Sequence, residues 1–330
     1  MTRKRISVVS PVFNEELTVR PFYERLAKAL APLRERYDFE IIFSNNRSSD
    51  RTAERVLELR AQDPTVQLLT LSRNFGYQHS MTAGIRQASG DAICVIDVDC
   101  EDPPEMIVTF IRHWEEGYDV VYGERDLRAE PFLLTWMRKL FYRVNKMIAD
   151  SDILLDMAEF CLMSSDVRDA VAANASTFPF VRGEIAHYGF RRLGIRYNRE
   201  GRIAGRSHYS LYGMWRFAVA GILSSTTVPL RIPLYLLPPL FAINALGFWL
   251  EVTARWPWGF ELLVMADLLY LAFGFAFLAL YTARNYRNVV GRPVAVVDWR
   301  LSALNAPRER SPNDIEPLWP RRPSDGGGGA

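Results

Sequence analysis

Carboxylate side chains gather directly after an apolar run that ends near residue 97. The run Ala92–Asp97 has the composition of a strand, in which side chains repeat every second residue, so Asp97 and Asp99 would share one face. Both carboxylates could then reach one divalent cation, directly or through water. Oxygen ligands with an open coordination shell suit Mg²⁺ or Mn²⁺, and such an ion would neutralise a diphosphate leaving group. Taken alone, an acidic pair of this kind is more often part of a solvated turn.

The residues that follow the acidic pair have the features of a helix start. Asp102 stands at a capping position, Pro103 and Pro104 suit the first turn, and Glu105 stands at the capping-box position. The spacing of apolar residues over Met106–Trp114 predicts the helix itself. We therefore expect Asp102 to cap this helix and not to bind the metal.

The elements that must position these acids alternate between β-rich and helical patterns. Segments such as Ala53–Leu59 and Met106–Trp114 have helical spacing and separate the apolar runs. This alternation predicts a mostly parallel sheet with helices on both faces, and in such sheets ligands bind beyond the carboxyl ends of the strands. Further strands and loops are expected between residues 150 and 202. The expected strands before them are Ile6–Ser10, Phe39–Ser44, Val66–Leu71, Ala92–Asp97 and Val120–Tyr122.

Two apolar stretches, Ile232–Leu250 and Leu262–Ala283, predict a pair of membrane-spanning helices. The first contains no charged residue and is long enough to cross a hydrocarbon core of about 30 Å. Arginines precede the pair at 231 and follow it at 284, 287 and 292, whereas the connecting turn holds few positive charges, so both outer ends are expected in the cytoplasm. The alternative is a buried helical pair in a soluble protein.

The chain is therefore divided into four parts. Residues 1–208 are expected to form a cytoplasmic catalytic domain, 209–230 an interfacial helical segment, 231–285 the two membrane helices, and 286–330 a cytoplasmic tail that is disordered toward its end. The net charge of +2 gives no field that would favour nucleic acid. The three cysteines lack metal-site or disulfide spacing and fit a reducing compartment.

Six segments carry a resemblance to a known family and occur in that family's order. They are residues 7–16, 71–76, 90–105, 121–125, 229–231 and 291–293. Together they resemble a family 2 glycosyltransferase of the polyprenyl-phosphate sugar synthase type, similar to dolichyl-phosphate mannose synthase. The resemblance spans about residues 5–297. It implies a Rossmann-like α/β nucleotide-sugar domain of the GT-A type with a C-terminal two-helix transmembrane hairpin.

The resemblance also implies where the donor and the metal bind. Where the family usually has two aspartates and a glycine, this chain has Asn45, Asn46 and Arg47. An asparagine both donates and accepts hydrogen bonds, which allows a different preference for the nucleobase. The donor nucleotide is expected at Pro11, Phe13, Glu15, Asn45 and Asp97, and the metal at Asp97, Asp99 and Glu101.

The acceptor side is implied in the same way. Three arginines, Arg125, Arg138 and Arg202, are expected to bind the acceptor phosphate, because guanidinium pairs with phosphate in bidentate fashion. Asp156 and Glu159 match the family's paired acids, and each is a candidate for a general base or for binding the sugar hydroxyls. A phosphate monoester is largely dianionic at neutral pH, so it needs positioning more than deprotonation.

The expected reaction is transfer of a hexose-type sugar, with inversion, from a nucleotide-sugar donor to a polyprenyl phosphate of the undecaprenyl type. It would take place at the cytoplasmic face of the inner (plasma) membrane, and the product would serve glycan assembly on the far side. Relatives of this type can form homo-oligomers. Two alternatives are a lipid-linked saccharide acceptor and a membrane scaffold of the same fold with weak catalysis.

Overall fold

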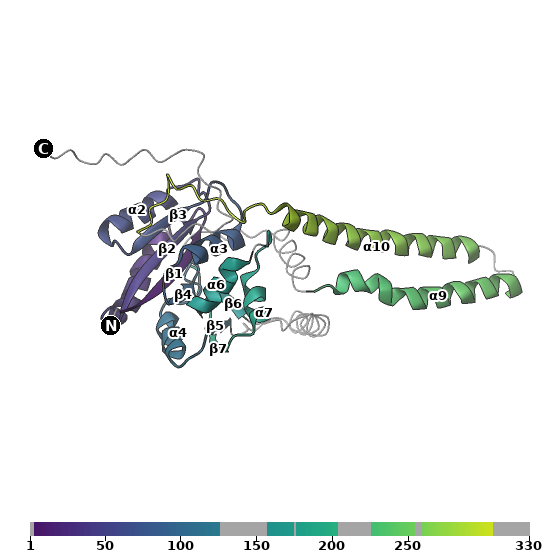
Figure 1. Cartoon of the computed structure of the whole chain (residues 1–330), viewed down its shortest axis with the longest axis horizontal. Helices are drawn as coiled ribbons and strands as arrows, with labels where there is room; N and C mark the ends of the chain where they lie inside the picture. Colours follow the sequence, from purple (N-terminus) through teal and green to yellow (C-terminus); the bar gives the residue numbers. More distant parts are fainter. Residues whose placement is uncertain (1–2, 126–156, 175, 204–225, 255–258, 306–330) are drawn as a thin grey trace.

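The computed structural model describes residues 3–125, 157–174, 176–203, 226–254 and 259–305 of the 330-residue chain. In these residues an α/β domain carries two long helices that project away from it side by side (Figure 1). Three sequence predictions lie outside the described residues: Asp156, Arg138 and nearly all of the interfacial segment 209–230.

The α/β domain is built on a seven-stranded sheet with the order β3-β2-β1-β4-β6-β5-β7. The four strands from β3 to β4 are parallel, as predicted, and β5 is parallel to β7. β6 runs antiparallel to both of its neighbours. The strands are β1 Lys4–Val12, β2 Tyr37–Asn45, β3 Val66–Thr70, β4 Ala92–Val95, β5 Val120–Arg125, β6 Met157–Ser164 and β7 Arg192–Tyr197.

Helices cover both faces of the sheet because its strands carry apolar residues on both sides. On β1, Ile6 and Val8 point into one cluster with Phe22 of α1, whereas Val9 points into a second cluster with Met81 of α3. One face is covered by α1 Val19–Leu30, the 3₁₀ turn Ala31–Leu33, α2 Thr52–Gln62 and α4 Met106–Glu115. The other is covered by α3 Tyr77–Gln87, α6 Ser165–Ala173 and α7 Val181–Tyr188.

Helix α3 packs unusually close to the sheet because it carries a glycine at the contact. A Cβ atom on Gly84 would lie only 2.5 Å from Cγ1 of Val9 in β1. A larger residue at 84 would therefore push the helix outward. The first turn of α3, which begins at Tyr77, lies beside the carboxyl end of β1 and the loop after β4, since Tyr77 lines one cavity with Val12 and bonds to Asp97.

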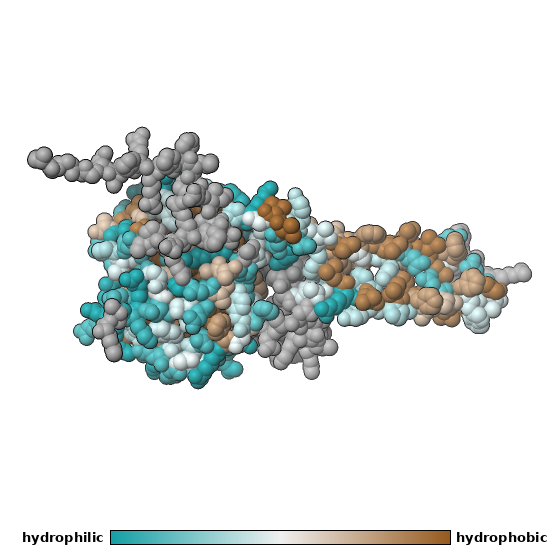
Figure 2. Space-filling view, in the orientation of Figure 1, coloured by the Kyte–Doolittle hydropathy of each residue, from teal (hydrophilic) through white to brown (hydrophobic). Residues whose placement is uncertain are grey.

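The two projecting helices, α9 Val228–Ala254 and α10 Gly259–Val290, contain the predicted membrane spans and extend beyond them. By length and composition both could cross a membrane. Their large apolar side chains are exposed, among them Phe241 at 76% and Phe275 at 68%, and apolar residues cover this part of the molecule (Figure 2). Such a surface is unfavourable in water, so the pair indicates membrane association.

Polar side chains join the two helices along the hairpin. Nδ2 of Asn244 in α9 donates to Oδ1 of Asp267 in α10 at 2.8 Å. The hydroxyl of Tyr270 donates to the carbonyl of Pro233 at 3.0 Å. In a hydrocarbon environment these groups have no water to bond to, so the two hydrogen bonds satisfy polar groups on both helices.

The chain after α10 returns to the sheet and covers its β3 edge. Gly291 ends α10 in the left-handed conformation, with φ of 64°, which glycine adopts without strain. The amide of Ala303 then donates to the carbonyl of Leu68 at 2.7 Å, and the amide of Asp298 donates to the carbonyl of Thr70 at 2.8 Å. An unpaired edge strand is a site for association with other chains, so this segment protects the domain. The predicted tail boundary at residue 286 falls inside α10.

Substituting Ala303→Pro is expected to lower the free energy of unfolding by about 1–3 kcal/mol, because proline removes the amide that pairs with Leu68. Thermal unfolding of the purified protein measures this change, and size-exclusion chromatography should detect self-association through the freed edge. The control Ala303→Ser keeps the amide and should behave as the wild type. Equal stability of the proline variant and the wild type would contradict the role of this segment.

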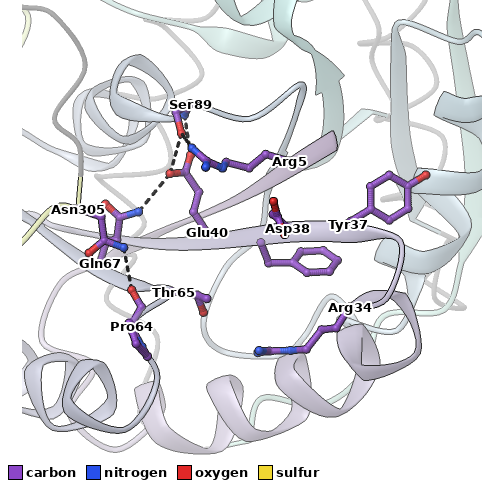
Figure 3. A pocket seen from close by; sticks show the side chains of 11 residues that line it. Arg5, Arg34, Tyr37, Asp38, Glu40, Pro64, Thr65, Gln67, Ser89 and Asn305 are labelled. Atoms are coloured by element: carbon purple, nitrogen blue, oxygen red, sulfur yellow. Dashed lines mark hydrogen bonds between the residues drawn. The ribbon is translucent and has the colours of Figure 1, made fainter. Parts of the chain in front are cut away.

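A cavity of about 420 Å³ lies near the amino ends of β1, β2 and β3, and Figure 3 shows the residues that line it. The carboxylate of Glu40 is buried there and accepts hydrogen bonds from Ser7, from Nε2 of Gln67 at 3.1 Å and from Oγ of Ser89 at 3.0 Å. These donors compensate the burial of its charge. None of the predicted site residues lines this cavity, and we interpret the cluster as structural.

Candidate active site

A second cavity, of about 410 Å³, opens beyond the carboxyl ends of the parallel strands, where the topology predicts a ligand. It brings together most of the residues expected at the donor and the metal, from the loops after β1 and β4. Its lining consists of Pro11, Val12, Phe13, Glu15, Asn46, Asn74, Gly76, Tyr77, Ser80, Asp97, Val98, Asp99 and Arg202.

The loops around this cavity turn sharply just past the strand ends. Asn14, Arg47 and Cys100, which follow β1, β2 and β4, have φ values of 55°, 60° and 55°. Non-glycine residues in this left-handed region cost about 1 kcal/mol or more each, and such residues concentrate at functional sites. The conformations are supported locally, for example by the amide of Ser49, which donates to Oδ1 of Asn14 at 2.8 Å.

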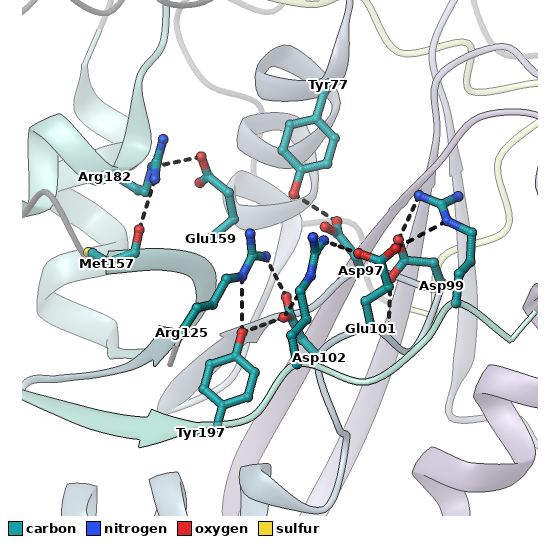
Figure 4. A network of polar contacts seen from close by, with 12 residues as sticks. Tyr77, Asp97, Asp99, Glu101, Asp102, Arg125, Met157, Glu159, Arg182 and Tyr197 are labelled. Carbon is teal, nitrogen blue, oxygen red and sulfur yellow. Dashed lines mark hydrogen bonds and ion pairs between the residues drawn. The ribbon is translucent and has the colours of Figure 1, made fainter. Parts of the chain in front are cut away.

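The acidic pair Asp97 and Asp99 lines the cavity from the loop after β4 (Figure 4). Asp97 is half-buried, and its Oδ1 accepts from the hydroxyl of Tyr77 at 2.7 Å. Burial, together with the nearby charge of Asp99, raises the pKa of Asp97 to about 7. Asp99 is 7% exposed, and burial raises its pKa as well.

A guanidinium group lies among the acids of this cluster. Nη2 of Arg202 is 2.9 Å from Oδ2 of Asp99, its Nε is 3.5 Å from Oε1 of Glu101, and its Nη1 is 3.7 Å from Oε1 of Glu15. Glu101 forms a further ion pair with Arg199. The guanidinium thus compensates the converging negative charge of the carboxylates, and the same negative charge would attract a divalent cation.

The oxygen donors present fit Mg²⁺ or Mn²⁺ with few protein ligands. Within the described ranges, no three acidic, histidine or cysteine side chains are arranged to hold one ion together. Asp97 and Asp99 would therefore supply two ligands, and donor phosphates and water would supply the rest, as is usual for Mg²⁺ beside a diphosphate. The carboxylate of Glu101 is engaged with Arg199 and Arg202, so its predicted place at the metal stays a prediction.

The prediction that Asp102 caps α4 is wrong. The helix begins at Met106, and no side chain caps its amino end. Asp102 is 1% exposed and accepts hydrogen bonds from Nη2 of Arg125 at 2.9 Å and from the hydroxyl of Tyr197. A buried carboxylate needs compensating donors, and the two residues from β5 and β7 satisfy it better than one exposed helix end. In this state Arg125 is engaged with Asp102, and its predicted phosphate contact stays a prediction.

Glu159, on β6, is not among the residues that line the cavity and belongs to the same network of polar contacts (Figure 4). Its Oε1 accepts from Nε2 of Gln78 at 3.0 Å and is 3.0 Å from Nε of Arg182. Burial raises its pKa, and the charge of Arg182 opposes that shift. Arg182 is itself fixed by a hydrogen bond from Nη1 to the carbonyl of Met157 at 2.8 Å. The carboxylate is thus held in place by α3 and α7.

The two asparagines at the end of β2 lie in different surroundings. The Oδ1 of Asn45 accepts from the amide of Ser48 at 2.9 Å, and Asn45 is not among the residues that line the cavity. Asn46 lines it, accepting from the amide of Phe75 at 2.8 Å and donating to Oδ1 of Asn74 at 2.8 Å. The nucleobase contact expected at Asn45 stays a prediction, with Asn46 as the neighbour that faces the cavity.

Sequence reasoning missed several residues of the site. Asn74 belongs to the segment 71–76 that the resemblance singled out, and Tyr77 follows it directly, so the same signal could have indicated both. Gln78 has the same neighbourhood. Arg182 stands in α7 without any local pattern, and only the fold brings it to Glu159.

A GT-A type α/β domain with two carboxylates at the carboxyl end of β4 defines a class of protein, the glycosyltransferases. The family model described as glycosyl transferase family 2 matches residues 7–169. An uncharacterized glycosyltransferase of Bacillus subtilis, YkcC, is 39% identical over 230 residues, which are 69% of this chain and 71% of that protein. The bactoprenol glucosyl transferase of Shigella phage SfV is 35% identical over 235 residues, 70% of this chain and 75% of that protein. The chain belongs to glycosyl transferase family 2, whose members transfer sugars with inversion.

Among solved structures, the chain is similar to glucosyl-3-phosphoglycerate synthase from Mycobacterium tuberculosis in complex with Mn²⁺, uridine diphosphate and product. The identity is 20%, the TM-score is 0.44, and the match covers 67% of this chain and 79% of that one. A similarity of this size identifies no ligand of this chain.

Proposed function

We propose that this glycosyltransferase moves a hexose-type sugar from a nucleotide-sugar donor to a polyprenyl phosphate at the cytoplasmic face of the inner membrane. One observation carries the proposal: the domain whose cavity is lined by Asp97, Asp99 and Arg202 carries a hairpin with an exposed apolar surface. The name of the similar phage enzyme, bactoprenol glucosyl transferase, supports the same acceptor. In this proposal both α9 and α10 cross the membrane, and their outer ends stay in the cytoplasm.

On the donor side, Pro11, Phe13 and Glu15 line the part of the cavity where the nucleoside would bind. Asp97 and Asp99 would hold a Mg²⁺ or Mn²⁺ ion, which supplies positive charge for the departing nucleoside diphosphate. Tyr77 orients Asp97 through its hydroxyl. Arg202 forms an ion pair with Asp99 at this site, and its guanidinium would pair with the oxygens of the acceptor phosphate.

On the acceptor side, a lipid phosphate oxygen attacks the anomeric carbon on the face opposite the leaving group, which inverts the configuration. Because the phosphate is already largely dianionic at neutral pH, the site needs to position it and does not need to deprotonate it. We assign Glu159 to binding the sugar hydroxyls. Gln78 and Arg182 fix its carboxylate, which is the arrangement expected for positioning a substrate.

Substituting Tyr77→Phe is expected to raise the Mn²⁺ concentration required for half-maximal transfer by about tenfold, because partners that orient a metal ligand contribute about 10–100-fold to affinity. A metal titration of initial transfer rates measures this. Tyr23→Phe is a matched control, since the Tyr23 hydroxyl also donates to an aspartate, Asp63, at 2.8 Å, and that residue does not line the cavity. An unchanged metal requirement in the Tyr77 variant would argue against Asp97 as a ligand.

The donor is best tested by equilibrium binding of a panel of nucleotide sugars to the purified full-length protein, with and without Mn²⁺. The proposal predicts binding of at least one donor that strengthens with the ion. Failure of every nucleotide sugar to bind under both conditions would contradict it.

A further inference from the structure

The carboxyl-terminal part of α10 contacts a short loop of the catalytic domain, residues 176–180, between α6 and α7. The guanidinium carbon of Arg284 lies 4.9 Å from the ring centroid of Phe178, and that of Arg287 lies 5.4 Å from it. Oδ1 of Asn288 accepts from the amide of Thr177 at 3.1 Å and from its hydroxyl at 2.7 Å. Residues spaced three or four apart share one helix face, so one face of α10 holds the loop.

The other side of this loop holds the first turn of α3. The carbonyl of Thr177 is 3.2 Å from Nε2 of His79. At the end of the loop, the amide of Val181 donates to Oε1 of Gln78 at 3.4 Å. The loop is therefore enclosed between the membrane hairpin and the helix that lines the active site.

The same turn of α3 bonds to two acids, Asp97 after β4 and Glu159 on β6. The hydroxyl of Tyr77 donates to Asp97 at 2.7 Å, and Nε2 of Gln78 donates to Glu159 at 3.0 Å. Two contacts thus connect α10 to α3: Asn288 with Thr177, and Thr177 with His79. The two residues before His79, Tyr77 and Gln78, bond to the two acids.

We propose that loop 176–180 connects α10 to the active site and sets the position of the active site relative to the membrane. α10 contacts Phe178 and Thr177 of the loop, and Thr177 contacts α3, whose first turn bonds to Asp97 and Glu159. Phe178 and Asn288 are positioning residues for the transfer and do not contact the reacting atoms. This inference rests on the proposed function, because it requires an acceptor held in the bilayer.

A phosphate that is anchored to a lipid cannot move freely to meet the donor. Its depth is set by the bilayer, so a displacement of the site by about 1 Å is not corrected by the acceptor and can cost about 100-fold in rate. A water-soluble acceptor diffuses into the cleft and adjusts to its position. Loss of the contacts between α10 and loop 176–180 should therefore impair transfer to the membrane acceptor selectively.

The test uses the full-length enzyme in lipid nanodiscs with two acceptors, undecaprenyl phosphate in the bilayer and a short-chain prenyl phosphate that is soluble in water. For Phe178→Ala and Asn288→Ala, we expect kcat/KM for undecaprenyl phosphate to fall about tenfold or more. The value for the soluble acceptor and the KM for the donor should stay within about twofold of the wild type, because both variants keep the hydrogen bonds of Tyr77 with Asp97 and of Gln78 with Glu159 inside the site.

Two variants serve as controls. Phe178→Tyr keeps an aromatic ring for the two guanidinium groups and should retain transfer to the membrane acceptor. Val289→Ala changes a side chain that is 77% exposed on the adjacent position of α10 and should behave as the wild type.

Equal losses of kcat/KM with both acceptors would contradict this proposal, because they would mean that the loop only maintains the fold of the site. Undiminished transfer to undecaprenyl phosphate in both alanine variants would overturn it as well. A wild-type enzyme that uses neither acceptor would instead contradict the proposed function, and this result is distinguishable because it needs no variant.

Discussion

Substituting Asp99→Asn is expected to reduce sugar transfer by about 10³-fold or more. Asp99 is buried in the loop after β4, and in the proposed mechanism it is one of two carboxylates that would hold the cation at the leaving group. The amide has nearly the same shape but no charge, so the loss reports on electrostatic stabilisation and not on packing. Initial rates of transfer at saturating donor and Mn²⁺ measure the effect.

The matched control is Asp38→Asn, which removes an exposed carboxylate from β2, whose start borders the other cavity. It should retain full activity. Thermal unfolding of both variants should stay close to that of the wild type, because Arg202 keeps its contacts with Glu101 and Glu15. An Asp99 variant that folds normally and retains more than about a tenth of the activity would exclude Asp99 as a metal ligand.

Substituting Arg202→Ala is expected to lower kcat/KM for polyprenyl phosphate by about 100-fold, because a guanidinium paired with phosphate in bidentate fashion contributes several kcal/mol. The lysine variant should recover part of this loss, since it restores the charge but not the two parallel hydrogen bonds. Arg196→Ala is the control: Arg196 is 81% exposed on β7, and its nearest acid, Glu124, is 3.8 Å away.

The affinity for the donor distinguishes two roles of Arg202. If this arginine binds the acceptor phosphate, the Kd of the donor should change by less than about threefold while transfer falls. An equal loss of donor affinity would instead assign the guanidinium to the donor diphosphate. The ion pair of Arg202 with Asp99 makes this the most informative arginine in the cavity.

Much of the fold could be predicted because its signals are local. The five expected strands are observed, since each is a short apolar run bounded by polar residues. The antiparallel direction of β6 could not be predicted, because a strand that is buried on both faces has the same composition in either direction. The pairing of residues 297–303 with the β3 edge could not be predicted either, since it joins residues that are more than 200 positions apart in the chain.

The candidate site was predictable where chemistry follows a strand directly, as at Asp97 and Asp99. It was not predictable where long-range charge pairing decides the role of a residue. Asp102 has a sequence typical of a helix cap, yet Arg125 and Tyr197, which are distant in sequence, compensate its buried charge. Likewise, nothing near Arg182 in the sequence indicates that it pairs with Glu159.

The most direct test of the account is a transfer assay with the full-length enzyme in nanodiscs that contain undecaprenyl phosphate. Radiolabelled nucleotide sugars are supplied with Mn²⁺, and the label is partitioned between an organic phase and water. The account predicts label in the organic phase, lost when the lipid phosphate is left out or the metal is chelated. Label that reaches only a water-soluble product, with none in the lipid phase for any donor, would contradict it.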